Sequence, residues 1–504
     1  MIIRKWFKGQ PLMLVTLFAG SVGGFGFSLL GPWAEWMDVP KGYQMQGDIG
    51  GPMNIGEGYR WNMPVVTYGF DRSFQDYFGS NGMAAVESAI GVLNALPPVS
   101  SIVLSNYPLV VWSMNHQAQA TNLLDLKSAT LFLLLEQMGL TDPTRYAFCI
   151  RDYFQDPGGT NYAFDVIERN FDPETGQPSP YVNAEQYTYM IEMLALSPSP
   201  GNEFCYTICY PVNPYVSQRL PAASLSYWTS SGLYLNNVSQ DDVGGLRYLL
   251  SESQVRCESL LPDVRAQGTN GSSLVWTADR PGVEKVTFVR HPYGTLNGEF
   301  KPYTNQWTDV YYDWDEPVYQ DVERITTSPD ILFTGRDLGP NMPMTRSGTT
   351  NWANNAVLND NSGGAGPGVV QPPITFTFNT DGPFYVNYYN PSALLDGLGF
   401  GNAYALYSWG SFDGSTNAPF MYPNVQIAFQ PTQVHFRLLL SGMTNDFLWP
   451  LAGEAYGRFF FQTATNLRDW TSLATLTNSG EAFSYQFQGA TNEAMRFFRT
   501  VQQR

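Results

Sequence analysis

Glu136 is the acidic residue whose setting in the sequence could support acid–base chemistry. It lies in the run from Leu126 to Leu140, LKSATLFLLLEQMGL, which is apolar on nearly every side and predicts a helix buried within a domain. A buried Glu136 paired with Asp125 or Asp142 could act as a general acid or base. The interpretation we favour is that the apolar side chains of this helix form core, and that Glu136 reaches a polar rim or a buried arginine.

Four cysteines, Cys149, Cys205, Cys209 and Cys257, lie in one third of the chain. In an exported protein, which the N-terminus indicates below, an even count predicts two disulfides, and four cysteines allow three pairings. The alternative is a zinc site with thiolate ligands, but the Cys205–Cys209 spacing has no matching second pair. We therefore predict two disulfides that staple the region from Cys149 to Cys257.

Motifs with a specific catalytic chemistry are absent from the sequence. It contains no Gly-x-Ser-x-Gly elbow, no Gly-x-x-x-x-Gly-Lys phosphate loop and no Cys-x-x-Cys-His haem site. Acid-rich loops at 313–316 (DWDE) and 359–361 (NDN) could bind calcium, although solvated turns are the simpler interpretation. A glycosidase carboxylate pair leaves no local signature and stays open. We expect no catalytic residue beyond the candidate Glu136, and no cofactor unless calcium binds.

Local patterns predict the elements that would position these residues. Pro64 to Phe70 is β-branched and aromatic and predicts a strand, and Met83 to Leu93 has helical spacing. Further helices are predicted over Leu124 to Leu140, Tyr187 to Leu196 and Ser239 to Leu250, the last with an N-cap serine and two aspartates in its first turn. Beyond residue 264, short aromatic and β-branched runs between turn residues are typical of sandwich strands.

Composition restricts the class of partner. The chain has 504 residues, a net charge of -17, 14% charged residues and 15% aromatic residues. Binding to nucleic acid needs clustered lysine and arginine, so this charge argues against it. Few charges with many aromatic and uncharged polar side chains are typical of an extracellular, β-rich protein.

The N-terminus predicts export from a bacterial cell. Arg4, Lys5 and Lys8 precede an uncharged stretch from Gly9 to Ala34, which is the pattern of a signal peptide. We expect it to be cleaved, with Ala19-Gly20-Ser21 as a candidate site. The alternative is an uncleaved membrane anchor.

The predicted fold class is an α+β N-terminal domain followed by all-β, sandwich-like domains. The expected divisions are a signal peptide or anchor at 1–34, a disulfide-stapled α+β domain at 35–263, a β-rich domain at 264–358, a linker at 359–373, a β-rich segment at 374–431 and a C-terminal β-sandwich module at 432–504.

Residues of about 60–253 resemble a matrixin-type metzincin domain. RWNMPVVTYGFDRSF with AAVESAIGVLNAL resembles the first strand and helix of that family, and SQDDVGGLRYLLSES resembles its closing helix. The stretch from Asp125 to Leu140 stands where the family has its zinc-binding helix, and Gly139-Leu140 matches the family's Gly-Leu.

The family's zinc site needs two histidines at i and i+4, a glutamate beside the first, and a third histidine beyond the helix. Alignment on Gly139 places Phe132, Leu133, Glu136 and Asp142 at those positions. The three histidines of the chain, His116, His291 and His435, lie too far apart in sequence to form the motif. The resemblance therefore implies a domain that has lost zinc hydrolysis.

The end of the chain resembles the small β-sandwich that closes many exported bacterial proteins. FFFQTATNLRDW and the terminal RFFR carry this resemblance. Trp470 within it could stack on a sugar, although a core position is the simpler interpretation.

Together these observations predict an exported bacterial protein of the cell envelope or extracellular space, without catalytic activity. Its expected partners are itself or an extracellular glycan, with no nucleic acid, and with a membrane only if the N-terminal segment stays uncleaved. Two alternatives stay open: a peptidase- or glycosidase-type hydrolase with a non-standard acid/base site, and a membrane-tethered subunit of a surface lattice.

Overall fold

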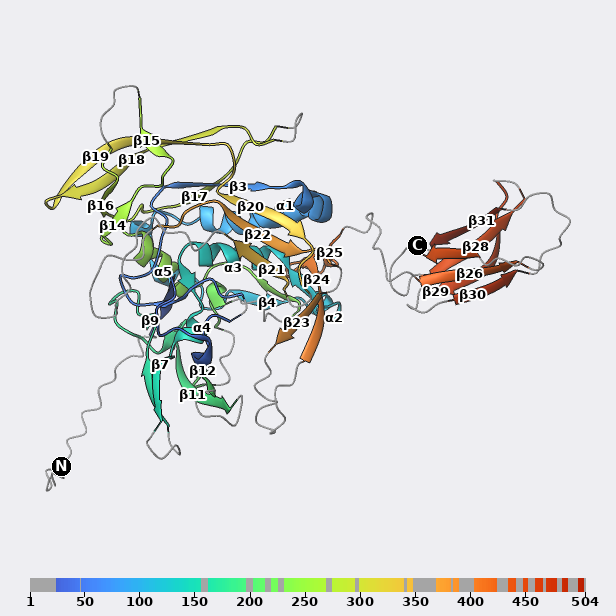
Figure 1. The fold of residues 1–504 in the computed structure, drawn as a ribbon, viewed down its shortest axis with the longest axis horizontal. Coiled ribbons are helices and arrows are strands. Elements are labelled where there is room, and N and C mark those ends of the chain that lie inside the picture. The colour runs from blue at the N-terminus through green and yellow to red at the C-terminus, as the bar shows by residue number, and fades with distance from the viewer. Residues whose placement is uncertain are drawn as a thin grey trace, which may run out of the picture.

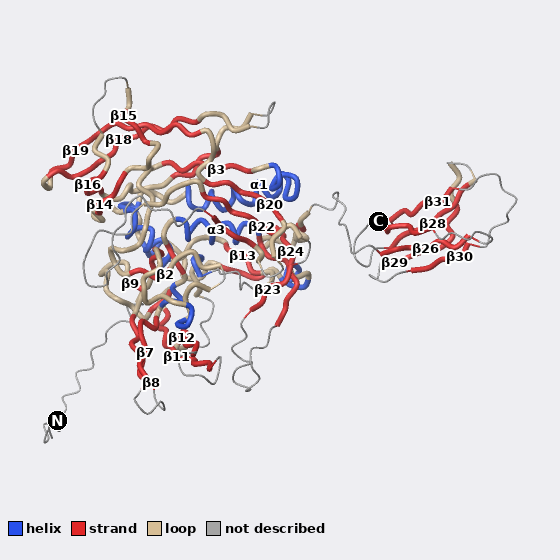
Figure 2. The backbone as a smooth tube through the Cα atoms, viewed as in Figure 1, coloured by secondary structure: helices blue, strands red, loops and turns tan. Residues whose placement is uncertain are grey.

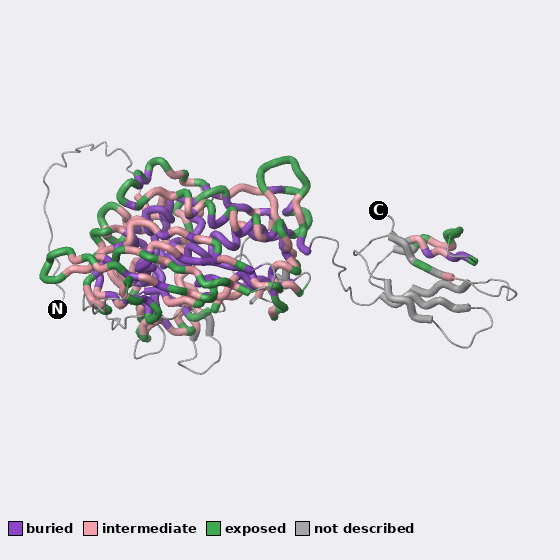
Figure 3. The backbone as a smooth tube through the Cα atoms, turned by 90° about the horizontal axis from the view of Figure 1, so that it is seen from above, coloured by how far each residue is buried: buried purple, intermediate pink, exposed green. Residues whose placement is uncertain are grey.

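The computed structural model describes residues 24–502, apart from 46, 156–161, 196–202, 214–218, 225–230, 269–273, 295–298, 340–341, 348–368, 382–383, 389–402, 424–433, 441–446, 452–457, 466–467, 478–482 and 488–496. The fold is mixed α/β, made mostly of strands with few helices, and its several sheets include antiparallel ones (Figures 1 and 2). The buried parts of the backbone gather inside the part of the chain before residue 424 (Figure 3).

A mostly parallel sheet lies at the centre of the fold. Its order is β17 (Thr287–Arg290), β3 (Val65–Phe70), β20 (Ile331–Arg336), β22 (Ile374–Asn379) and β21 (Met344–Ser347), of which only the β21–β22 pair is antiparallel. The strands are rich in β-branched and aromatic residues and largely buried, as parallel strands are. The predicted strand at Pro64 to Phe70 is confirmed as β3. The sheet therefore combines strands from three of the divisions predicted from the sequence, 35–263, 264–358 and 374–431.

Two helices form the layer beside this sheet. Helix α1 (Arg72–Asn94) is capped by the preceding residue, Asp71, whose side chain accepts from the Phe74 amide. The helix buries an apolar face against the sheet. Helix α3 (Leu126–Gln137) packs on α1 and is buried all round, so the predicted buried helix is confirmed. A further predicted helix is confirmed as α5 (Gln240–Leu250), with a capping box between Ser239 and Asp242.

Strand β1 (Phe27–Gly31) corrects one boundary. It is fully buried and pairs with β2 (Gly51–Met53), β6 (Leu140–Thr141) and β9 (Asn170–Phe171). The predicted export segment, 1–34, therefore overlaps a strand of the core. The candidate cleavage site at Ala19-Gly20-Ser21 lies outside the described residues.

The helix predicted over Tyr187 to Leu196 is wrong. The chain there forms β11 (Glu185–Ala195), which pairs along its length with β12 (Glu203–Pro211). Its odd-numbered side chains from Tyr187 to Met193 are apolar and mostly alternate with polar ones, which is the period of a strand. With the β7–β8 pair (Cys149–Gln155 and Tyr162–Ile167), this hairpin extends downward in Figure 1.

The other elements complete the fold. The short helices are α2 (His116–Ala120) and α4 (Pro143–Tyr146). The shorter sheets contain β4 (Trp112–Met114), β5 (Leu123–Asp125), β10 (Tyr181–Val182), β13 (Leu233–Leu235), β23 (Phe384–Tyr388), β24 (Ala403–Ser411) and β25 (Phe420–Met421). Near the C-terminus, one three-stranded sheet holds β26 (Val434–Leu440), β27 (Phe447–Leu451) and β30 (Phe483–Phe487), and another holds β28 (Arg458–Ala464), β29 (Thr471–Thr477) and β31 (Phe497–Gln502).

A five-stranded antiparallel sheet lies above and to the left of the parallel one in Figure 1. Its order is β14 (Arg256–Ser259), β16 (Thr277–Arg280), β18 (Tyr303–Asp313), β19 (Glu316–Thr326) and β15 (Val264–Ala266). Strands β18 and β19 form a long hairpin that reaches the left edge of the molecule in this view.

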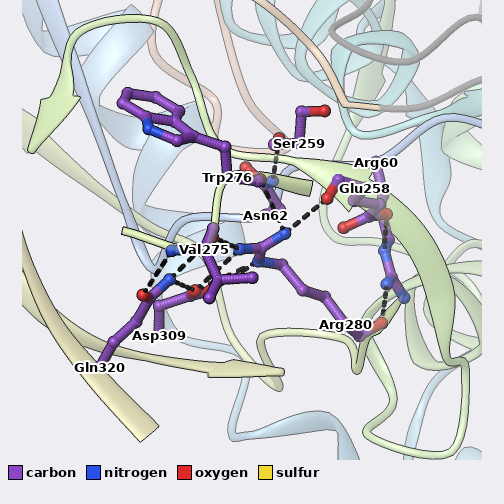
Figure 4. Close-up of polar contacts among 9 residues, drawn as sticks. All are labelled: Arg60, Asn62, Glu258, Ser259, Val275, Trp276, Arg280, Asp309 and Gln320. Carbon is purple, nitrogen blue, oxygen red and sulfur yellow. Dashed lines mark hydrogen bonds and ion pairs between the residues drawn. The ribbon is translucent and has the colours of Figure 1, made fainter. Parts of the chain in front are cut away.

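Buried arginines join this antiparallel sheet to the rest of the protein (Figure 4). Arg60 Nε lies 2.7 Å from Glu258 Oε1 of β14, and Arg60 Nη2 donates to the Arg280 carbonyl at 2.9 Å. Arg280 in turn pairs with Asp309 of β18 at 2.9 Å, and Gln320 Nε2 of β19 donates to the same carboxylate at 2.7 Å. One polar chain thus crosses four strands of the sheet, and its members are buried except for the partly exposed Gln320.

A third arginine joins the hairpin to the parallel sheet. Arg324 of β19 pairs with Asp263 at 2.8 Å and with Asp330 at 2.5 Å. Asp330 also accepts from the amide and hydroxyl of Thr67 in β3, each at 2.8 Å. The base of the hairpin is therefore fixed to β3 of the parallel sheet.

We expect Arg280→Ala to lower the free energy of unfolding by about 3–5 kcal/mol, because it leaves the buried Asp309 carboxylate without its cation. Arg265→Ala is the matched control, since Arg265 lies in the same sheet but is 58% exposed in its pair with Glu323, and should cost under about 1 kcal/mol. Urea unfolding measures both. Equal losses for the two variants would contradict a special role for the buried chain.

Candidate functional site

Glu136 lies in the last turn of α3 and is 7% exposed. Its Oε1 accepts from Arg346 Nη2 of β21 at 2.8 Å, and the same nitrogen donates to the Gly47 carbonyl at 2.7 Å. The Arg346 side chain is itself buried. The expectation that Glu136 reaches a buried arginine is therefore confirmed.

Burial raises the pKa of Glu136 to about 7. The Arg346 charge opposes this shift, whereas the nearby charges of Asp48 and Asp142 add to it. A carboxyl group with this pKa could exchange a proton near neutrality. In the described structure, however, it lies inside the protein against a guanidinium, so it cannot reach a substrate without a rearrangement.

The two acids considered as partners of Glu136 have capping roles instead. Asp125 begins α3 and accepts from the Ser128 amide at 2.9 Å, and its pKa is raised to about 6 by burial. Asp142 begins α4 and accepts from the Thr144 amide at 2.8 Å, and burial also raises its pKa. The charge of Asp142 raises the pKa of Glu136. The side-chain oxygens of Asp125 and Asp142 accept from backbone amides at the starts of the two helices.

The positions that the metzincin resemblance aligns with zinc ligands form core or caps. Phe132 and Leu133 are buried apolar residues of α3. His116 begins α2 and contacts Gln119, His291 is buried beside Thr326, and the side chain of His435 lies outside the described residues. Within the described part of the chain, no group of three or more His, Cys, Asp or Glu could hold a metal ion.

Asp241 and Asp242, the acid pair of the predicted closing helix, connect distant segments. Asp241 accepts from the Gly26 amide at 3.1 Å and from the Asn183 amide at 2.6 Å. Asp242 accepts from the amides of Ala222 and Ala223 at 2.8 and 2.9 Å. Their chemistry in this structure is the binding of backbone N–H groups.

The predicted disulfides are not formed in the structure, where none of the four cysteines is joined to another. Cys149 donates to the Tyr146 carbonyl, and Cys209 contacts the Arg145 and Phe148 carbonyls nearby. Cys205 lies four residues from Cys209 along β12, too far for a bond between them, and Cys257 is in a different sheet. An even count of cysteines therefore does not place them in two pairs.

The tip of the β18–β19 hairpin carries the most exposed aromatic side chain of the described residues. Trp314 is 94% exposed. It and Asp315 form a two-residue turn with φ of 51° and 67°, a conformation that costs about 1 kcal/mol or more for each residue other than glycine. In the sequence this loop stands out by its acids. A second signal, which the sequence analysis does not use, is a tryptophan in a tight turn, where asparagine and glycine are preferred.

Apolar side chains continue from this tip along one face of the hairpin. Val310 pairs with Tyr319, and Tyr312 pairs with Pro317, so all four side chains lie on the same face. Tyr319 is 66% exposed, and Pro317 is exposed. We call these four residues and Trp314 the hairpin-tip surface. On the other face, Trp307 and Val322 pack into the core.

Comparison with protein-family models, with curated proteins and with solved structures found no match. The metzincin resemblance and the resemblance of the C-terminal module therefore stay predictions. The part of the metzincin sequence match that lies in the central sheet is β3, since the other strands of that sheet follow residue 253. None of the described helices is long and apolar enough to cross a membrane.

We expect Glu136→Gln to change the pH dependence of stability. Because the pKa of Glu136 is raised from 4.5 to about 7, the folded state binds this proton more tightly than the unfolded state, and stability is lost as pH rises through that range. The wild type should lose about 3 kcal/mol more than the variant between these pH values. Urea unfolding across this range measures the difference.

Glu174→Gln is the control for this pH experiment, because Glu174 is 63% exposed beside Arg247 and should leave the profile unchanged. Parallel profiles for wild type and Glu136→Gln would show that Glu136 is not held in a pKa-shifting environment.

We expect four reactive thiols per chain when the protein is unfolded without reductant and titrated with a thiol reagent, since no disulfide is formed. In the native protein Cys149 and Cys205 should not react, because both are buried and burial raises the pKa of Cys149 to about 12. Finding fewer thiols before reduction than after it would restore the disulfides predicted from the sequence.

Proposed function

We propose that the protein is an exported, non-catalytic binding or structural protein of the bacterial cell envelope or extracellular space. The observation that carries the proposal is the hairpin-tip surface. Large aromatic side chains held on a rigid, projecting hairpin are the usual anchors of binding surfaces, because they bury much area with little loss of side-chain freedom.

The setting of the acids argues against the hydrolase alternative. Glu136 is paired with Arg346 inside the fold, and Asp125 and Asp142 cap helices. Catalysis needs an acid or base within hydrogen-bond reach of the substrate, and these three carboxylates are directed at the protein itself. In this proposal the metzincin resemblance is to a domain that keeps the family's order of strands and helices but lacks its zinc chemistry.

The finer fold assignment belongs to the same proposal. We infer an α+β part followed by sandwich-like β units, of which the two three-stranded sheets near the C-terminus would be the last. Within that module, the Arg499 guanidinium lies 4.1 Å from the centre of the Trp470 ring, which occupies a face that a sugar would need. Trp470 is therefore a weaker candidate for glycan contact than Trp314. The lattice-subunit alternative depends on residues 1–23, which lie outside the described residues.

We expect Trp314→Ala with Tyr319→Ala to abolish whatever binding or self-association the protein has, because together these changes remove the two most exposed rings of the hairpin. The measurements are retention on a glycan array and light scattering of the mature protein. Ile325→Ala, a 40% exposed position at the base of the same hairpin, is the control and should behave as wild type. Substrate turnover that Glu136→Gln eliminates would instead favour the hydrolase.

A further inference from the structure

We propose that the hairpin-tip surface binds a cationic peptide segment of a partner protein. This inference rests on the proposed binding function and names the chemistry of the partner. Arginine or lysine side chains of that segment would stack on the exposed rings of Trp314 and Tyr319 and pair with the carboxylates beside them.

The register of the hairpin brings the apolar and acidic groups together. Asp315 lies in the turn beside Trp314, and Asp321 lies two residues after Tyr319 on the same face of the hairpin. Both of these acids are exposed. Asp313 and Glu316, the last pair before the turn, lie on the opposite face, which is that of Trp307 and Val322. The two exposed rings thus each lie within two residues of an exposed carboxylate, which is the combination that recognises a guanidinium or an ammonium.

Charge favours a cation over the other partners considered. Between residues 303 and 326 the hairpin has six acids and one base, Arg324, which is already paired with Asp263 and Asp330. Two of the acids, Asp309 and Glu323, are paired with Arg280 and Arg265, so the charge toward solvent is that of the other four. A second copy of this chain, with a net charge of -17, would be repelled, and an anionic polymer would be repelled equally. A neutral glycan could stack on the rings but would gain nothing from the net charge.

The inner face of the hairpin explains why such a surface can be presented. Trp307 and Val322 pack into the core, and the Arg280–Asp309 and Arg324–Asp330 pairs fix the strands from the same side. The outer face is then held in place without contributing to that packing. The tryptophan in the turn has φ 51°, where asparagine or glycine would be less strained, so the geometry of the turn does not itself require a tryptophan.

The test uses the mature full-length protein and a labelled peptide of alternating arginine and glycine, with a peptide of alternating glutamate and glycine as the matched probe. Fluorescence anisotropy measures the affinity at about 50 and about 300 mM NaCl. We expect the arginine peptide to bind, to weaken about tenfold at the higher salt, and the glutamate peptide not to bind.

Two variants separate the contributions. Trp314→Asn removes the ring, keeps Asp315 and places a preferred residue in the turn, so the hairpin should form at least as well, with an unchanged or higher melting temperature and affinity lowered about tenfold. Asp315→Asn with Asp321→Asn keeps the rings and should lower both affinity and its salt dependence. Glu323→Gln is the control, because that carboxylate is already paired with Arg265.

Wild-type affinity in the Trp314→Asn variant would overturn the proposal. So would glycan retention that depends on Trp314 while the arginine peptide does not bind, although the proposed binding function would then stand. If neither peptide nor glycan binds and the protein does not self-associate, both the inference and the proposed function fail.

Discussion

The chain of buried arginines is the interaction on which the arrangement of the sheets depends. Arg60, Arg280 and Arg324 each pair with a buried carboxylate, and Arg60 and Arg280 also donate to main-chain carbonyls. A buried guanidinium without such partners would be strongly destabilising, so the antiparallel sheet can occupy only the position that satisfies all three. Hydrophobic contact alone would allow the packed sheets to shift against each other, whereas ion pairs of this kind require particular atoms to meet. These ion pairs also fix the orientation of the projecting β18–β19 hairpin.

Local patterns in the sequence predicted elements whose signal lies within one segment. The apolar run of α3, the capped start of α5 and the β-branched strand β3 were recognised because period and capping are encoded within a few residues. The segment of strand β11 predicts a helix by its methionines and leucine, which are good helix formers, although its alternation of apolar and polar residues indicates a strand. Strand β1 is not predicted from the sequence, because it lies within an apolar N-terminal stretch typical of export signals.

What could not be predicted is which distant residues meet. The sequence indicated that Glu136 would reach a buried arginine, but nothing local identifies Arg346, which comes from an edge strand late in the chain. The cysteines show the same limit, because their count suggests pairs while strand geometry separates Cys205 from Cys209 and both from Cys257. The exposure of Trp314 follows from the register of two strands, and only the turn between them was visible in the sequence.

The position of β3 has a consequence for how the protein is made. This strand is the first of the central sheet to be synthesised, yet both its neighbours, β17 and β20, are encoded more than halfway along the chain. Until the ribosome has produced them, the nascent N-terminal half exposes an apolar strand edge. Such non-local pairing slows folding and favours aggregation. A chain built this way is therefore exposed to aggregation until the second half has been synthesised and the sheet can close around β3.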